Sequence, residues 1–289
     1  LGMEYNTNLE NFMRYLLEKK IIFIENENNI EDSNEFRRFD RQLIFFDEYF
    51  SQDKILNQKK LSESTFLIFG TGAIGSGFAI NLAMMGVKKF VFIDKGILKE
   101  SDISRHYYYS SESIGDFKVD VLSKYLKKIN SDISCKVYKD ILIYDSDLDK
   151  YFNNPIDFVI NTLDEPYIGF TSMKIGRKCY IDNLPLYIGG GFDAHLMSTG
   201  ELIIPNKTPC VDCYVNHYSN KLKGWTPKYN ILHEDDSNHF FEVGGLASMS
   251  LFSVSYGLIR ILNYFLEETI DSLGRGELLF NNLKIIYNE

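Results

Sequence analysis

Short apolar runs alternate with helix-like patterns through the middle of the chain. We expect strands where β-branched and aromatic residues cluster, at 65–69, 89–94, 134–139, 157–163 and 179–182. We expect helices where apolar residues recur every three or four positions, at 74–86, 115–129 and 167–178. This alternation predicts an α/β fold of the Rossmann-like, doubly wound type, with a mostly parallel sheet covered by helices on both faces.

The chain begins with a different pattern. Residues 8–19 have helical spacing and 20–24 form a short apolar run, a helix and wing that would make about half of a small winged module. Residues 25–34 are almost entirely polar and lack the apolar content needed to order themselves. We therefore expect an appendage and linker at 1–34 and a main domain at 35–289.

The second half predicts an extension of the sheet. Glycine-rich and apolar stretches alternate over 184–204, as in an antiparallel part of a sheet, and 283–287 reads as a last strand. Residues 218–240 are polar without a period and predict a long loop. The apolar segment 245–266 is interrupted by serines and Arg260, which favours a buried helix over a membrane span.

Three glycines stand where the first strand of the main domain meets its helix. Gly70 permits a sharp exit from the strand, Gly72 lets backbone approach a phosphate, and Gly75 lets the helix pack closely on the strand. The start of that helix directs N–H groups and a positive dipole end to the same place. Asp94 closes the next strand, where an acid can accept hydrogen bonds from a ribose. Together they predict a nucleotide site.

Composition narrows the choice of partners. The net charge of −9 argues against a nucleic-acid partner, because neutralising phosphates requires clustered lysine and arginine. Four cysteines and the lack of a long uninterrupted apolar span lead us to expect a soluble cytoplasmic protein that does not use a membrane.

Two cations follow the predicted ribose acid. Arg105 and Lys118 would suit an enzyme that cleaves between phosphates, since such an enzyme needs fixed positive charge where negative charge grows. Spacing alone leaves a second interpretation open, in which both side chains belong to an ordinary exposed surface. Asp164 follows the strand at 157–163, and thus belongs to the same edge of the predicted sheet.

An ordered set of motifs resembles the ThiF/MoeB/HesA family of adenylating enzymes, the bacterial relatives of ubiquitin-activating enzymes. The motifs are Arg38-Phe-Asp-Arg-Gln42, Gly70-Thr-Gly-Ala-Ile-Gly75, Asp94, Arg105, Gly115-Asp-Phe-Lys118, Asp164 and Cys210-x-x-Cys213. Within the family the likeness is greatest to MccB-type enzymes, which activate the C-terminus of a short ribosomal peptide. The helix and wing at 9–24, which resemble part of a peptide-clamp module, and the run 184–192 suggest this.

The resemblance implies a role for each matching position. Arg41 resembles an arginine that reaches across a homodimer to the partner's ATP, and Asp94 the acid that binds ribose. Arg105 resembles an arginine that contacts the polyphosphate, and Lys118 a lysine beside the α-phosphate. Asp164 resembles an aspartate associated with magnesium and close to the substrate carboxylate. The implied cofactors are therefore ATP and Mg²⁺.

Several positions depart from the family pattern. Gly96 stands where a second acid is common, Asp102 where asparagine is usual, and His106 where glutamine is usual. Asp102 would put a carboxylate near the phosphates, which is unfavourable unless magnesium or Arg105 neutralises it.

The cysteine pair leaves zinc open. Cys210 and Cys213 could supply two corners of a tetrahedral zinc site, but such a site needs four ligands and the family's second pair is missing after the last strand.

The main hypothesis is an enzyme that adenylates the C-terminal carboxylate of a peptide or small protein. We expect no thioester relay, because the predicted loop at 218–240 contains no cysteine. Three alternatives remain: a scaffold that only binds a leader peptide, an activator of a ubiquitin-like sulfur carrier, and a nicotinamide-dependent oxidoreductase. Retention of Arg105, Lys118 and Asp164 disfavours the scaffold, which needs no cations facing phosphate.

Overall fold

The computed structural model describes residues 7–19, 21–22, 37–106, 108–192, 196–221, 245–271 and 274–287. They belong to two compact units, Leu1–Arg41 and Gln42–Glu289. The first contains the predicted amino-terminal helix, α1 (Thr7–Glu18), and a 3₁₀ turn, η2 (Arg37–Phe39). In the predicted wing, residues 21–22 form a bend. The other wing residues and the predicted linker lie outside the described residues, so the predicted boundary after residue 34 stays a prediction.

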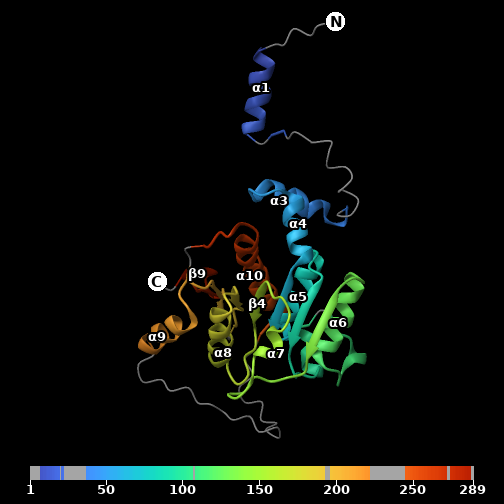
Figure 1. The fold of residues 1–289 in the computed structure, drawn as a ribbon, viewed down its shortest axis with the longest axis vertical. Coiled ribbons are helices and arrows are strands. Elements are labelled where there is room, and N and C mark those ends of the chain that lie inside the picture. The colour runs from blue at the N-terminus through green and yellow to red at the C-terminus, as the bar shows by residue number, and fades with distance from the viewer. Residues whose placement is uncertain are drawn as a thin grey trace. The chain divides into compact units, whose positions relative to one another are not determined.

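A six-stranded sheet forms the centre of the second unit (Figure 1). Its strands lie in the order β3-β2-β1-β4-β5-β7. Its strands are β1 (Thr65–Phe69), β2 (Lys89–Ile93), β3 (Ser134–Tyr138), β4 (Phe158–Asn161), β5 (Leu186–Ile188) and β7 (Glu201–Ile203). All pairs are parallel except β5 with β7. Ile68 is in register with Phe92 on one side and with Ile160 on the other. From β1 the sheet grows first to one side, through β2 and β3, and then to the other side, through β4 and β5. This reversal of strand order creates the crevice where α/β sheets bind ligands.

Helices cover both faces of this sheet, as the sequence predicts. The period of two along β1 places Phe66 and Ile68 in one buried cluster and Leu67 and Phe69 in the other. The first cluster is closed by α5 (Ala73–Met84), α6 (Lys118–Ile129) and α10 (Ala247–Glu267). The second is closed by α7 (Asp149–Phe152), α8 (Ile168–Ile181) and α9 (Val211–Lys221). The strands therefore carry apolar side chains on both faces, which explains their nearly continuous apolar sequences.

The remaining elements lie before and beside the main sheet. The chain forms α3 (Asp40–Tyr49) and α4 (Lys54–Glu63) before β1, and η3 (Glu100–Ser104) and η4 (Ser111–Ser113) between β2 and α6. A small antiparallel sheet of β6 (Leu196–Ser198), β8 (Gly276–Leu279) and β9 (Lys284–Tyr287) supplies the predicted extension together with β7.

Three local predictions were wrong. Residues 179–182 are not a strand: α8 continues to Ile181, and the next strand is β5. Cys179 is buried on that helix, so the apolar pattern that predicted a strand comes from the buried face of the last turn of α8. The helix predicted from residue 115 begins at Lys118, because Gly115 has a positive φ of 90° and cannot belong to its first turn. The loop predicted from residue 218 begins later, since α9 reaches Lys221, and 222–240 lie outside the described residues.

The apolar helix α10 is part of the core. By length and composition it is the one helix of the described residues that could cross a membrane. Its residues Val254, Ile261 and Phe265 are buried, and they belong to the same cluster as Phe66 and Ile68 of β1. This packing confirms the prediction of a buried helix.

Candidate functional site

The glycine turn after β1 has the close contacts expected of a phosphate-binding turn. Gly70 has a φ of 83°, and a Cβ there would lie 2.8 Å from the hydroxyl of Thr162. A Cβ on Gly75 would collide with the carbonyl oxygen of Gly70, so this glycine allows α5 to pack against the turn. A Cβ on Gly72 would meet no atom within 4 Å. The turn is therefore packed on its protein side at Gly70 and Gly75, and open at Gly72.

The helix after this turn begins without a side-chain cap. Gly72 is the N-cap of α5 and offers no side-chain acceptor to the first-turn N–H groups. The uncapped N–H groups and the helix dipole favour an anion at this end. The structure thus supports the predicted anion cradle.

Asp94, directly after β2, is held on both oxygens. Its Oδ2 accepts hydrogen bonds from Thr71, at 2.7 Å from the backbone N and 2.8 Å from the hydroxyl. Its Oδ1 accepts a hydrogen bond of 2.6 Å from the backbone N of Gly96. A Cβ on Gly96 would lie 2.8 Å from that oxygen and 3.2 Å from Cδ of Lys118. Glycine at this position therefore leaves room for the acid and the lysine to lie side by side.

The two predicted cations converge on Asp102, which is 3% exposed. Arg105 Nη2 lies 3.1 Å from Oδ1, and Lys118 Nζ lies 3.4 Å from Oδ2. The backbone N of Lys99 donates to Oδ2 at 3.1 Å. Burial by itself would raise the pKa of Asp102, but this hydrogen bond and the neighbouring charges leave the pKa below its usual value. Asp102 is therefore an anion. Arg105, one of the two neutralising partners that the sequence left open, is paired with it, and Lys118 is a second partner.

His106 is buried beside this cluster. Its Nδ1 lies 3.0 Å from the carbonyl oxygen of Asp102, and because only a donor can pair with a carbonyl, Nδ1 carries the proton. Burial lowers the pKa of His106. Its Nε2 is buried and has no hydrogen-bond partner among the described residues. The ring is thus a neutral neighbour of the cations.

The end of β4 is fixed by short polar side chains. Thr162 shares its hydroxyl hydrogen between the carbonyl oxygens of Phe69 and Gly70, both at 3.0 Å. Asn161 donates to Thr171 at 3.2 Å and accepts from the backbone N of Leu163 at 3.1 Å. These contacts tie the segment that precedes Asp164 to the glycine turn. Neither Thr71 nor Thr162 was selected from the sequence, although Thr71 stands between Gly70 and Gly72 and Thr162 stands two positions before Asp164.

Asp164 completes the edge formed by the carboxyl ends of the strands. The residue as a whole is exposed, yet the protein around its carboxyl raises its pKa, a shift that Lys118 and Arg105 oppose and Asp94 reinforces. The charges of Lys118, Arg105 and Asp94 therefore all act on the carboxyl of Asp164. Magnesium in nucleotide sites needs only one or two carboxylates together with substrate phosphates, so the carboxylate of Asp164 fits such an ion.

The structure therefore brings together seven of the eight residues predicted to bind nucleotide or act in catalysis, all in the second unit. They are Gly70, Gly72, Gly75, Asp94, Arg105, Lys118 and Asp164. Arg41 lies in the first unit, where it is exposed on α3.

The cysteine pair lies at the start of α9. The sulfur atoms of Cys210 and Cys213 are 3.6 Å apart, and both thiols are free. Among the described residues, no group of three or more histidine, cysteine, aspartate or glutamate side chains could hold a metal ion. Asp212, between the two cysteines, is paired with Arg177 at 2.6 Å. The described residues thus supply two of the four ligands that the predicted zinc site requires.

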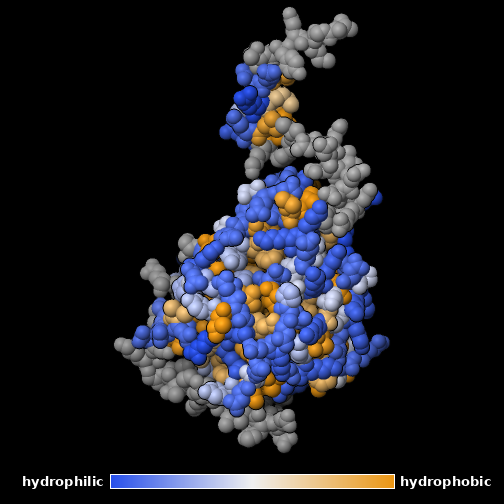
Figure 2. Space-filling view, in the orientation of Figure 1, coloured by the Kyte–Doolittle hydropathy of each residue, from blue (hydrophilic) through white to orange (hydrophobic). Residues whose placement is uncertain are grey.

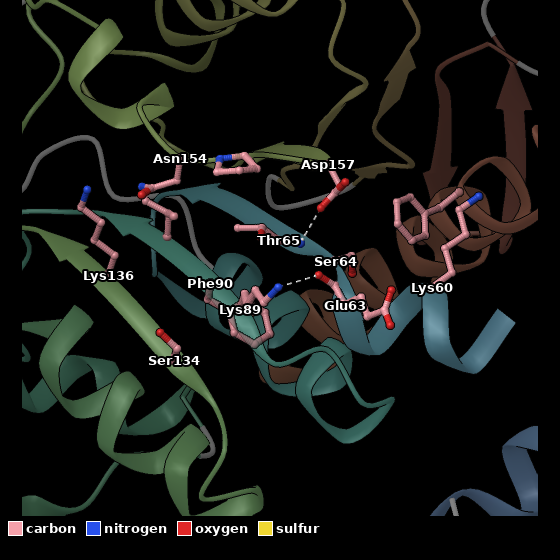
Figure 3. Close-up of a pocket in the computed structure, with 13 residues that line it drawn as sticks. Lys60, Glu63, Ser64, Thr65, Lys89, Phe90, Ser134, Lys136, Asn154 and Asp157 are labelled. Carbon is pink, nitrogen blue, oxygen red and sulfur yellow. Dashed lines mark hydrogen bonds between the residues drawn. The ribbon is translucent and has the colours of Figure 1, made fainter. Parts of the chain in front are cut away.

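A hollow of about 710 Å³ lies at the other edge of the sheet, where the parallel strands begin (Figure 3). Thr65, Lys89 and Ser134, the first residues of β1, β2 and β3, line it. Its ammonium groups have partners: Lys60 lies 5.1 Å from the ring centroid of Phe265, and Lys89 donates to the carbonyl oxygen of Glu63 at 3.1 Å. None of the predicted site residues lines this hollow.

Comparison with known proteins identifies related chains. The sequence model described as the ThiF family matches residues 39–246. "Adenylyltransferase and sulfurtransferase UBA4" of Scheffersomyces stipitis is 30% identical over 184 residues, which cover 63% of this chain and 39% of the relative. "Protein HesA, vegetative" of Trichormus variabilis is 27% identical over 183 residues, covering 63% of this chain and 64% of the relative. The chain spans about two fifths of the length of the UBA4 relatives it matches.

Solved structures share the fold over nearly the whole chain. E. coli MccB crystallised with AMPCPP and selenomethionine-labelled MccA superposes with a TM-score of 0.77 at 20% identity, covering 99% of this chain and 79% of MccB. E. coli MccB with ATP gives 0.75 at 19% identity, covering 100% and 79%. This likeness confirms the predicted Rossmann-like fold with its antiparallel extension.

Proposed function

This chain belongs to the ThiF family, and from that premise we propose that it is an adenylyltransferase that uses ATP to activate the C-terminal carboxylate of a peptide or small protein. A carboxylate oxygen attacks the α-phosphorus, the bond from that phosphorus to the bridging oxygen breaks, and pyrophosphate leaves. The acyl adenylate is the product. The reaction needs no protein nucleophile, because positioning and fixed charge lower the barrier.

One observation carries this proposal: Arg105 and Lys118 approach the same point beside an acid suited to ribose and an uncapped helix end. The triphosphate would lie over the turn at Gly72, with the ribose on Asp94. Lys118 would serve the α-phosphate and Arg105 the departing phosphates. A nicotinamide-dependent oxidoreductase has little use for this pair of cations.

Magnesium fits the same arrangement. When bound, it would neutralise charge on the phosphates, held by Asp164. Burial raises the pKa of Asp164, so a nearby positive charge would favour the charged form of its carboxyl.

A peptide substrate is supported by the structural likeness to MccB, whose structures contain MccA and an ATP analogue. We therefore place the reaction in the biosynthesis of a modified ribosomal peptide in the cytoplasm. The helix α1, as part of a peptide clamp, would contribute to holding an extended substrate.

A second candidate substrate is a ubiquitin-like sulfur carrier. The curated relatives named adenylyltransferase and sulfurtransferase favour it. Both candidates share the adenylation step and differ in the size of the carboxylate donor.

Peptide-dependent exchange of labelled pyrophosphate into ATP tests the activity. Peptides encoded by short reading frames next to the gene and a ubiquitin-like carrier protein would be compared as carboxylate donors. Exchange with one class, and AMP attached to its C-terminus by mass spectrometry, would support adenylation and identify the donor. Peptide binding without exchange would favour the scaffold alternative. A thermal shift with NAD but none with ATP and magnesium would favour the oxidoreductase.

A homodimer is part of this proposal. Arg41 lies on the same helix as the exposed apolar residues Ile44, Phe45 and Tyr49. Figure 2 shows apolar side chains at the surface around α3 and α4. An exposed apolar helix face of this kind is suited to cover by a second subunit, which would bring Arg41 to the neighbour's ATP.

A further inference from the structure

Asp102 is an unusual group to find between two phosphate-binding cations. It is 3% exposed, and each of its oxygens faces a different cation, Arg105 at 3.1 Å and Lys118 at 3.4 Å. A triphosphate bound to Arg105 and Lys118 would bring more negative charge next to the Asp102 carboxylate, which is already paired with both cations. Like charges at such distances repel strongly where solvent is scarce.

Resting on the proposed function, we propose that Asp102 is a built-in counter-ion that makes the site select magnesium-bound ATP over free ATP. Free ATP carries more negative charge than its magnesium complex, so Asp102 repels it more. The same carboxylate holds both cations in place before nucleotide arrives. Asp102 is thus a positioning residue that also sets which form of the nucleotide binds.

The surroundings of Asp102 prevent an easy escape from this repulsion. The backbone N of Lys99 donates to Oδ2, and the carbonyl oxygen of Asp102 accepts hydrogen bonds from the backbone N of Arg105 and of His106, at 3.0 and 3.1 Å. Its backbone is therefore fixed within η3, and its side chain cannot turn away without leaving the Lys99 N–H group unpaired. The carboxylate stays beside the cations when ATP binds.

Arg105 retains donors for a phosphate despite its pair with Asp102. The bond to Asp102 uses Nη2, while Nε is buried and has no hydrogen-bond partner among the described residues. The side chains of Arg105 and Lys118 keep 29% and 18% of their surface exposed. Both cations can therefore contact an incoming anion while Asp102 remains paired with them.

The test is the affinity for AMPCPP, an ATP analogue whose α–β link cannot be cleaved, measured by calorimetry on the full chain with EDTA or with magnesium. Asp102→Asn keeps the shape and one oxygen acceptor but removes the charge. We expect metal-free AMPCPP to bind to Asp102→Asn at least about tenfold more tightly than to the wild type. This factor is equivalent to about one pKa unit of interaction. Affinity with magnesium should change by less than about threefold, because the metal already screens the phosphates.

Glu100→Gln is the matched control. Glu100 lies in the same 3₁₀ turn and carries the same charge, but its side chain is exposed. Solvent screens its charge, so the two affinities should keep their wild-type ratio within about twofold. If Asp102→Asn does not fold, Asp102→Ser keeps an acceptor for the Lys99 N–H group and serves the same test.

The outcomes separate the two proposals. The affinity of Asp102→Asn for metal-free AMPCPP could equal that of the wild type, or it could weaken in parallel with the affinity in magnesium. Either result would make Asp102 a structural residue and overturn only its role in selecting the nucleotide. Wild-type protein that binds AMPCPP in neither condition would overturn the use of ATP, and the role of Asp102 with it.

Discussion

Thr71 donates two hydrogen bonds to the same oxygen of Asp94, from its backbone N at 2.7 Å and its hydroxyl at 2.8 Å. Since Gly96 occupies the other oxygen, the carboxylate is held in one orientation. Thr71→Val keeps the shape of the side chain and removes one donor. The KM for ATP should rise about fivefold, since a net hydrogen bond contributes about 1 kcal/mol.

Initial rates of peptide-dependent pyrophosphate exchange at varied ATP measure this change. Thr65→Val, a similar substitution at the start of β1, is the control and should leave the KM for ATP unchanged. A KM for Thr71→Val equal to that of wild type would mean that the backbone N alone orients Asp94.

Arg105 should contribute more to the rate of pyrophosphate exchange than an uncharged side chain of the site such as Thr71. Arg105→Ala removes a fixed cation from the departing phosphates, and the exchange rate should fall by about 100-fold or more, as when one preorganised donor is lost. Arg177→Ala is the control, because Arg177 forms an exposed pair with Asp212 away from the site. Exchange by Arg105→Ala within about threefold of wild type would contradict the assigned role.

Subunit mixing tests the homodimer. Arg41→Ala and Arg105→Ala proteins should each be inactive, and their mixture should regain up to about a quarter of wild-type activity, because hybrid dimers contain one site with both arginines. Sedimentation should show dimers throughout. A fully active monomer, or a mixture that stays inactive after subunits have exchanged, would contradict a site shared between subunits.

The sequence was most informative where local signals agreed. Both ends of the strand at 65–69 were predicted correctly. The apolar run ends directly before Gly70, whose positive φ marks the turn that ends the strand. The strand predicted at 179–182 was wrong, since a short apolar run after a helix can equally be its last turn. Local pattern cannot separate these two states when the side chain, as at Cys179, is buried in both.

The charge balance of the site was predicted only in part. The sequence indicated that Asp102 would need a neutralising partner and that Arg105 could be one. The contact with Lys118 depends on how the segment between β2 and η3 meets the start of α6, where the backbone N of Lys118 donates to the carbonyl oxygen of Gly96 at 2.9 Å. This tertiary contact has no counterpart in the sequence pattern around either residue. The pairing of both cations with one buried acid thus required the structure.

The fate of the activated carboxylate depends on the cysteines. The chain has four, and all lie in the described residues. Burial raises the pKa of Cys135 and of Cys179, so both are poor nucleophiles. The pKa of Cys210 is lowered instead, first by the backbone of Cys213 and also by the contact between the two thiols, which favours its thiolate over those of the two other cysteines.

We predict that none of them receives the acyl group, so that the carboxylate stays as an acyl adenylate or passes to an amine or amide nucleophile. Intact-mass measurement after incubation with ATP, magnesium and the peptide should show AMP on the peptide and unmodified enzyme. An enzyme–peptide adduct released by hydroxylamine would reject this prediction. Cys210→Ser and Cys213→Ser would then locate the thioester, because the partly buried thiol of Cys135 and the buried thiol of Cys179 remain in both variants as internal controls.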